Sequence, residues 1–146
     1  MIEIGRATLE DIRRQAAREY PHECCGLLIG RVEDGGRRRV VVETRAVENS
    51  WADGDSLTHR MRITPADYAR AERDFAARDL GVVGNYHSHP NHAAVPSQFD
   101  LEHLAPWPTM SYVVVAVGAE GARELRSWEL AADRSRFTEE EITEGS

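Results

Sequence analysis

The sequence has no lysine, and all 18 of its basic residues are arginines. The chain therefore cannot be conjugated to a protein tag through a lysine side chain of its own. The formal net charge is -7, and the arginines are scattered except for one group, Arg37-Arg38-Arg39. Because a nucleic-acid-binding protein needs a basic face, we do not expect nucleic acid as a partner.

Long apolar runs are also missing. No stretch approaches the roughly 20 apolar residues that a membrane-spanning helix needs. The first residues, Met1 to Arg6, lack the apolar stretch of a signal peptide. We therefore expect a cytoplasmic protein without a membrane partner.

Cysteine is scarce, because the chain has only Cys24 and Cys25, which are adjacent. A structural zinc site needs spaced pairs of ligands, and cytosolic proteins rarely keep disulfides. We predict that both cysteines are small, buried packing residues.

The length of 146 residues predicts one domain over residues 1–137, followed by an acidic tail, 138–146, that we expect to be disordered. Apolar periodicity and turn residues predict an α/β fold with a mixed β-sheet and two main helices. The predicted helices are residues 8–20, 64–80 and 98–104. The predicted strands are residues 23–30, 39–46, 60–63, 82–86, 111–117 and 123–130, with a loop over residues 48–58.

The residues most indicative of chemistry follow the apolar run Val82-Val83-Gly84. His87 and His89 lie two residues apart on a predicted strand, so their side chains point to the same side. Asp100 follows after ten intervening residues. Two imidazoles and a carboxylate are the ligand set of a catalytic zinc that keeps its fourth position for water.

A structural explanation exists for part of this pattern. Ser97-x-x-Asp100 is also a helix start, with Ser97 as the N-cap and an acidic residue in the first turn. The two roles are compatible, since capping would hold Asp100 in place for the metal. The order of all these residues favours a hydrolytic metal site.

Hydrolysis at zinc also needs a group that accepts the proton of the attacking water. Glu23 is a candidate because it opens a predicted buried strand, where a carboxylate has little reason to exist for packing. The alternative is that Glu23 lies exposed in the connection between helix and strand. The residues alone leave both readings open.

The whole pattern resembles the JAMM (MPN-plus) metalloproteases, in particular their compact bacterial members. The resemblance rests on three segments over nearly the whole chain, about residues 2 to 130. These segments are Glu23-Cys24-Cys25-Gly26-Leu27-Leu28-Ile29-Gly30, His87-Ser88-His89-Pro90 and Ser97-Gln98-Phe99-Asp100.

The resemblance implies a cytidine-deaminase-like α/β/α sheet that holds one zinc ion. It implies that His87, His89 and Asp100 ligate the metal, that Glu23 is the general base and acid, and that Ser97 stabilises the oxyanion. The implied substrate is a ubiquitin-like or sulfur-carrier protein, cut at an amide or isopeptide bond after its C-terminal Gly-Gly, for example with release of cysteine. The short connection after Asp100 departs from ubiquitin-specific members, so we expect poor cleavage of polyubiquitin.

Two other functions share this fold. A nucleobase deaminase needs a His-x-Glu segment and Cys-x-x-Cys, and neither occurs here. A non-catalytic MPN scaffold that binds protein partners is the stronger alternative, although such modules typically lose a ligand or the glutamate. The sequence does not fix the oligomeric state, and it allows a homodimer.

Overall fold

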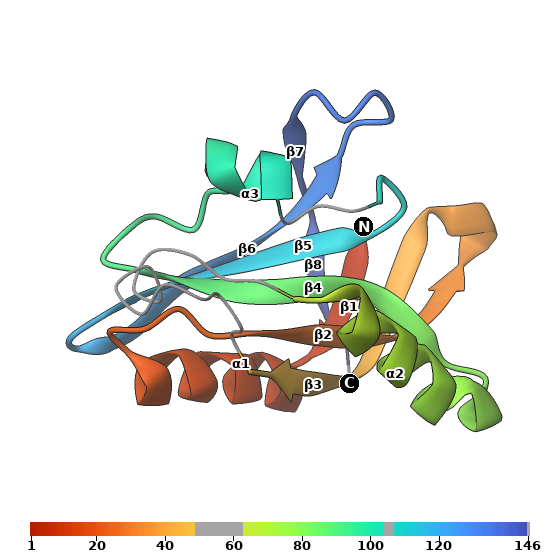
Figure 1. The fold of residues 1–146 in the computed structure, drawn as a ribbon, viewed down its shortest axis with the longest axis horizontal. Coiled ribbons are helices and arrows are strands. Elements are labelled where there is room, and N and C mark those ends of the chain that lie inside the picture. Colours follow the sequence, from red (N-terminus) through yellow and green to blue (C-terminus); the bar gives the residue numbers. More distant parts are fainter. Residues whose placement is uncertain (49–62, 104–106, 146) are drawn as a thin grey trace.

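The computed structural model of the chain describes residues 1–48, 63–103 and 107–145. Three helices and eight strands occur in this part of the chain (Figure 1). In chain order they are β1 (Ile2–Gly5), α1 (Arg6–Glu19), β2 (Cys25–Glu33), β3 (Arg38–Val47), α2 (Pro65–Phe75), β4 (Gly81–Pro90), α3 (Gln98–His103), β5 (Ser111–Gly118), β6 (Gly121–Leu130), β7 (Phe137–Glu140) and β8 (Ile142–Gly145).

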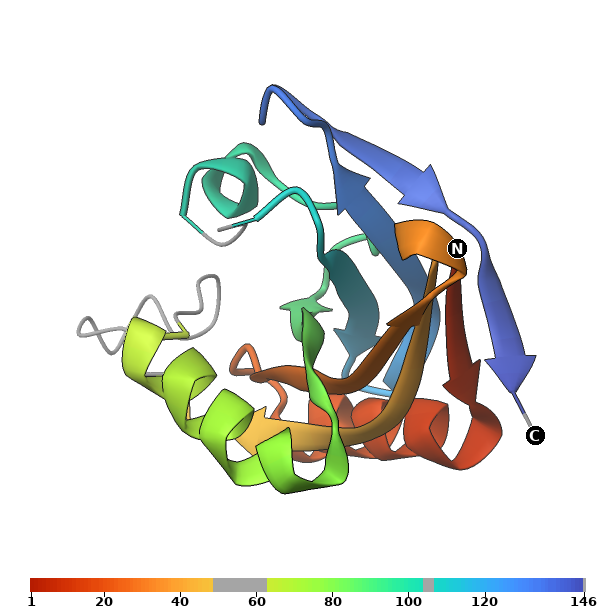
Figure 2. The same ribbon diagram turned by 90° about the vertical axis from the view of Figure 1, so that its right-hand side faces the viewer.

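All the described strands belong to one mixed sheet, in the order β7-β6-β5-β4-β2-β3-β1-β8. β4 lies in its middle, antiparallel to β2 and parallel to β5. The sheet curls strongly (Figure 2), and its two edge strands, β7 and β8, are consecutive in the chain. Because β4 lies in the middle of the sheet, its side chains point alternately to the two faces that the helices cover.

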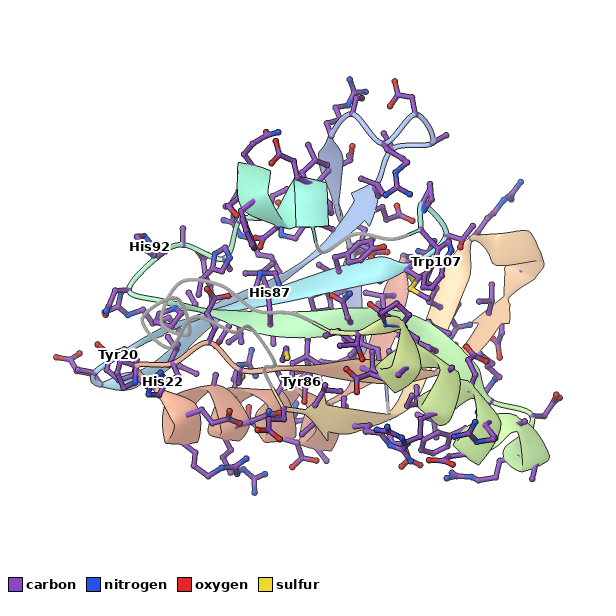
Figure 3. The ribbon with its side chains drawn as sticks, viewed as in Figure 1. Tyr20, His22, Tyr86, His87, His92 and Trp107 are labelled. Atoms are coloured by element: carbon purple, nitrogen blue, oxygen red, sulfur yellow. The ribbon has the colours of Figure 1, made fainter. Side chains whose placement is uncertain are left out.

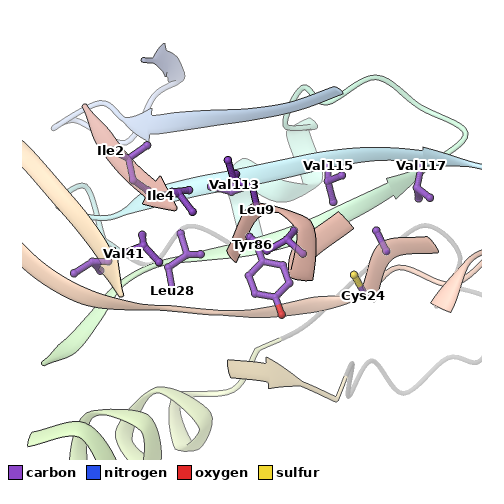
Figure 4. Packing of buried hydrophobic residues seen from close by; sticks show 13 residues of the cluster. Ile2, Ile4, Leu9, Cys24, Leu28, Val41, Tyr86, Val113, Val115 and Val117 are labelled. Atoms are coloured by element: carbon purple, nitrogen blue, oxygen red, sulfur yellow. The ribbon is translucent and has the colours of Figure 1, made fainter. Parts of the chain in front are cut away.

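Helices cover the two faces of the sheet. Leu9, Ile12 and Ala16 of α1 pack on one face, in a cluster that includes Tyr86 and Val113 (Figure 4). Tyr68, Ala71 and Phe75 of α2 pack on the other face, where Leu101 of α3 joins them. The predicted mixed sheet flanked by helices is therefore confirmed.

The helix predicted to start at Thr64 does so by a capping box. The Thr64 side chain accepts a hydrogen bond from the backbone of Asp67, whose carboxylate accepts one from the backbone of Thr64. Its predicted end at residue 80 is wrong, because α2 ends at Phe75, a short 3-10 turn follows it, and Asp79 takes the left-handed conformation, with φ 58°. Gly81 instead opens β4.

The predicted disorder of the tail, residues 138–146, is wrong for residues 138–145. β7 pairs with β6, and β8 pairs with β1, a strand that was not predicted. Backbone pairing stabilises this segment despite its acidic composition, and the carboxylate of Glu140 is buried with a hydrogen bond from Ser127.

Two sequence predictions fall largely outside the described residues: the loop at 48–58 and the strand at 60–63. Among the helices that the structure describes, none has the length and apolar character required to cross a membrane.

Candidate metal centre

Side chains of β4 alternate between the two faces of the sheet. Tyr86 packs towards α1, whereas Asn85 donates a hydrogen bond to the hydroxyl of Tyr68 on α2. His87 and His89 share the parity of Asn85, so both imidazoles lie on the face that α2 and α3 cover. Figure 3 shows His87 between the central strands and α3.

The three predicted ligands converge on one point. Nε2 of His87 lies 3.0 Å from Nε2 of His89, and these two nitrogens lie 3.2 Å and 3.1 Å from Oδ2 of Asp100. Ligands bound tetrahedrally at zinc distances lie about 3.3 Å apart. The donor types and their separations therefore fit a zinc ion.

Asp100 reaches this point from the first turn of α3. Its Oδ2 accepts a hydrogen bond from the backbone N–H of Ser97 at 2.8 Å, and Oγ of Ser97 accepts one from the backbone N–H of Asp100 at 3.1 Å. The cap that the sequence suggested and the convergence of Asp100 on the histidines thus occur together.

Charge at this point favours a cation. Burial lowers the pKa of His87, although Asp100 opposes the shift. Burial alone would raise the pKa of Asp100, but attraction to His87 and hydrogen bonds from His87 and the backbone of Ser97 hold it well below its usual range. The result is a buried carboxylate that converges with two imidazole nitrogens, which is an arrangement that a divalent cation stabilises.

Glu23 lies at the same place and is only 3% exposed. One ligand-type atom each of Glu23, His87 and His89 lies within 4.8 Å of the others. Pairing between β2 and β4 accounts for this, because Cys25 lies opposite His87, and the Cys24 carbonyl accepts a hydrogen bond from the Ser88 backbone. The alternative in which Glu23 is exposed in a connection is wrong.

A pocket of about 340 Å³ opens beside these groups. Its lining consists of Glu23, His89, Pro90, His92, Ala93, Val95 and Ser97. The pocket therefore brings both predicted catalytic residues, Glu23 and Ser97, to the same space as one of the predicted ligands.

The prediction that the two cysteines are buried is confirmed. Cys24 and Cys25 are buried, as expected, and burial raises the pKa of Cys24 to about 12. His92 is exposed at the pocket.

The curled sheet between two helical layers, with a His-x-His pair and an aspartate converging beside a glutamate, defines an α/β protein with a cluster of side chains that could hold a metal ion. Residues 5–131 match the family model described as prokaryotic homologs of the JAB domain. The chain belongs to this family, and the resemblance to the JAMM proteins is confirmed.

Curated relatives include enzymes. The chain is 29% identical to a desampylase from Haloferax volcanii, over 82% of this chain and 79% of that protein. It is also 29% identical to a CysO-cysteine peptidase from Mycobacterium tuberculosis, over 79% of this chain and 73% of that protein. A tail tip assembly protein K from Escherichia phage N15 is 33% identical over 75% of this chain, a match that spans only 40% of the phage protein.

Solved structures agree on the fold. A protein from Salinibacter ruber is 38% identical, with a TM-score of 0.75, covering 99% of this chain and 92% of that one. A protein from Desulfitobacterium hafniense is 27% identical, with a TM-score of 0.82, covering 99% and 93%. A JAB1/MPN domain protein from Archaeoglobus fulgidus shares the fold, with a TM-score of 0.57 at 20% identity, covering 98% of each chain.

Proposed function

We propose that this protein is a zinc-dependent metallopeptidase that hydrolyses the amide or isopeptide bond after the Gly-Gly C-terminus of a ubiquitin-like or sulfur-carrier protein. The observation that carries the proposal is the convergence of His87, His89 and Asp100, with atoms 3.0 to 3.2 Å apart, at a pocket lined by Glu23. Membership of the prokaryotic JAB family and the peptidases among the relatives support it.

His87, His89 and Asp100 would hold the metal. Bound zinc lowers the pKa of a coordinated water to about 7 and polarises a carbonyl oxygen. The remaining steps belong to side chains of this chain.

Glu23 would accept the proton of the attacking water and deliver it to the leaving amine. A carboxylate that does not ligate the metal serves this purpose, because it can move a proton without disturbing the ligand set. Its burial beside the ligands keeps bulk water from competing for that proton.

Ser97 would donate a hydrogen bond to the oxyanion of the tetrahedral intermediate. Its Oγ already accepts the backbone N–H of Asp100, which fixes the oxygen and leaves the hydroxyl proton available for donation. One such donor contributes roughly 3 kcal/mol to the transition state in other hydrolases.

The relatives and the pocket both support this substrate class. The names desampylase and CysO-cysteine peptidase support a conjugate of a small carrier protein as the substrate. A glycine tail suits the approach to the site, because residues without side chains can pass close to the backbone of the pocket lining.

The experiment uses two substrates of one Gly-Gly-tailed carrier: one with an added C-terminal cysteine, the other joined to a lysine side chain. The zinc-loaded protein is incubated with each, and mass spectrometry measures the loss of cysteine or the release of the carrier. We expect chelator-sensitive cleavage of at least one substrate, reduced about 10² to 10⁴-fold in Glu23→Gln. Glu23→Gln should still bind one zinc ion per chain.

The outcomes separate the alternatives. Cleavage of only one substrate identifies the leaving group as a free amino acid or a lysine side chain. Binding of the carrier without any cleavage, unchanged by Asp100→Ala and by chelation, would instead identify the non-catalytic scaffold. Full activity in Glu23→Gln would contradict the proposed role of the glutamate.

A further inference from the structure

The two histidines of the candidate metal centre differ in the hydrogen-bond partner of their Nδ1 atoms. Nδ1 of His89 lies 3.0 Å from the carbonyl oxygen of Ala93. Nδ1 of His87 is buried, and no residue of the described ranges hydrogen-bonds to it. His89 is therefore the imidazole whose orientation and tautomer are set by a defined neighbour. A proton on Nδ1 that is donated to Ala93 leaves the lone pair of Nε2 directed at His87 and Asp100.

The peptide group that receives this hydrogen bond is itself held on its other side. The carbonyl of Ala93 and the N–H of Ala94 belong to one peptide unit, and that N–H lies 3.4 Å from Oε1 of Glu124. The next carbonyl, that of Ala94, accepts a hydrogen bond of 3.1 Å from Nε1 of Trp128. Both side chains come from β6, which lies two strands away from β4 in the sheet.

Apolar packing also holds the loop after β4 at Ala94. Ala94 is fully buried, in a cluster with Val114 and Ala116 of β5, and the ring of Trp128 packs against this cluster. The loop after β4 is therefore attached to the sheet at Ala94, one residue beyond the carbonyl that contacts His89. Because the ring of Trp128 packs against this cluster and Glu124 is exposed, the indole N–H is the better-defined of the two attachments.

We propose that Trp128, assisted by Glu124, is a positioning residue for the metal centre: it holds the Ala93–Ala94 segment so that the Ala93 carbonyl orients His89 for metal binding. The inference rests on the metal site of the proposed function. It does not depend on which substrate is cleaved.

The test compares Trp128→Phe, which keeps an aromatic ring and removes the indole N–H, with Trp107→Phe. Trp107→Phe is the control, because it removes the same indole N–H. Trp107 lies on the other side of His87 from His92 (Figure 3). Zinc dissociation constants are measured by competition with a chromophoric chelator. The tautomer of His89 is measured by long-range ¹H–¹⁵N spectra of the full chain, both metal-free and zinc-loaded.

We expect Trp128→Phe to weaken zinc binding about 10-fold, the lower end of what loss of an outer hydrogen bond costs at metal sites. We also expect a mixture of His89 tautomers in the metal-free variant, where the wild type shows the Nδ1–H form. Trp107→Phe should match the wild type in both measurements. Glu124→Ala should weaken zinc binding more than Glu124→Gln, which keeps an oxygen acceptor for the Ala94 N–H.

Unchanged zinc affinity and tautomer in Trp128→Phe would overturn the inference, as would an equal loss in Trp107→Phe. If Trp128→Phe does not fold, the exposed Glu124 pair decides by the same two measurements. A wild type that binds zinc with the Nδ1–H tautomer but cleaves no conjugate would refute the proposed peptidase and leave this inference standing.

Discussion

Ser97 has two separable roles in the structure, and substitutions can divide them. Its Oγ accepts the backbone N–H of Asp100, which caps α3, and its hydroxyl proton is proposed to stabilise the oxyanion. Ser97→Ala removes both roles. Ser97→Gly removes the hydroxyl but retains most of the capping preference, and Ser97→Thr retains both.

The expected magnitudes differ enough to be distinguished. Loss of an N-cap costs about 1 kcal/mol when Ala replaces Ser, but only a few tenths when Gly does. Loss of one oxyanion donor costs roughly 3 kcal/mol, or about a 100-fold decrease in kcat. Ser97→Ala should therefore lose both stability and activity. Ser97→Gly should lose activity about equally while its free energy of unfolding stays close to that of the wild type.

Urea unfolding of the metal-free variants measures the contribution of the cap to stability. The kcat for cleavage of the carrier conjugate by the zinc-loaded variants measures the contribution of the oxyanion donor. Zinc content is measured for each sample, because the cap also positions Asp100. A Ser97→Gly variant with one bound zinc and kcat within twofold of the wild type would refute the oxyanion role. Ser97→Thr is the control and should lie near the wild type in both assays.

Three further predictions concern the metal and the packing beneath it. Chelation should lower the Tm by about 12 °C, because a ligand at 1,000 times its Kd contributes about 4 kcal/mol and each kcal/mol shifts a chain of this size by about 3 °C; an unchanged melting curve would contradict the metal site. Iodoacetamide at pH 8 should not alkylate the folded protein, because burial raises the pKa of Cys24 to about 12 and also raises that of Cys25; labelling before unfolding, seen by mass spectrometry, would contradict the burial of these thiols. Gly26→Ala should destabilise the fold by roughly 1–3 kcal/mol in urea unfolding, because an added Cβ would lie 2.2 Å from the buried Tyr86 hydroxyl; a loss under about 0.5 kcal/mol would mean that the ring can move aside.

The sequence predicted those parts of the site that depend on local rules. The parity of His87 and His89 follows from the strand period, and the Ser97–Asp100 cap follows from helix-terminus chemistry. The position of Glu23 could not be derived in this way. It depends on the antiparallel pairing of β2 with β4, which is a long-range contact, and only the family resemblance decided between its two readings.

The same distinction explains the errors in the fold. Residues 138–145 are acidic and lack a long apolar run, so local composition favours disorder. Their order comes from pairing with β6 and with β1, whose residues are more than a hundred positions away in the second case. The attachment of Ala94 by Trp128 was likewise hidden, because 34 residues separate the two and the tryptophan has no distinguishing sequence motif.

The tail strands are nevertheless connected to the site through β6. β7 pairs Glu139 with Trp128, and Ser127 donates a hydrogen bond of 2.8 Å to the buried carboxylate of Glu140. That carboxylate also lies 3.6 Å from the guanidinium of Arg39 on β3. β3 is four strands away from β6 in the sheet, but the curl of the sheet brings Arg39 close to Glu129 of β6. The segment that was predicted to be disordered therefore connects β7 and β8, the two edge strands of the sheet.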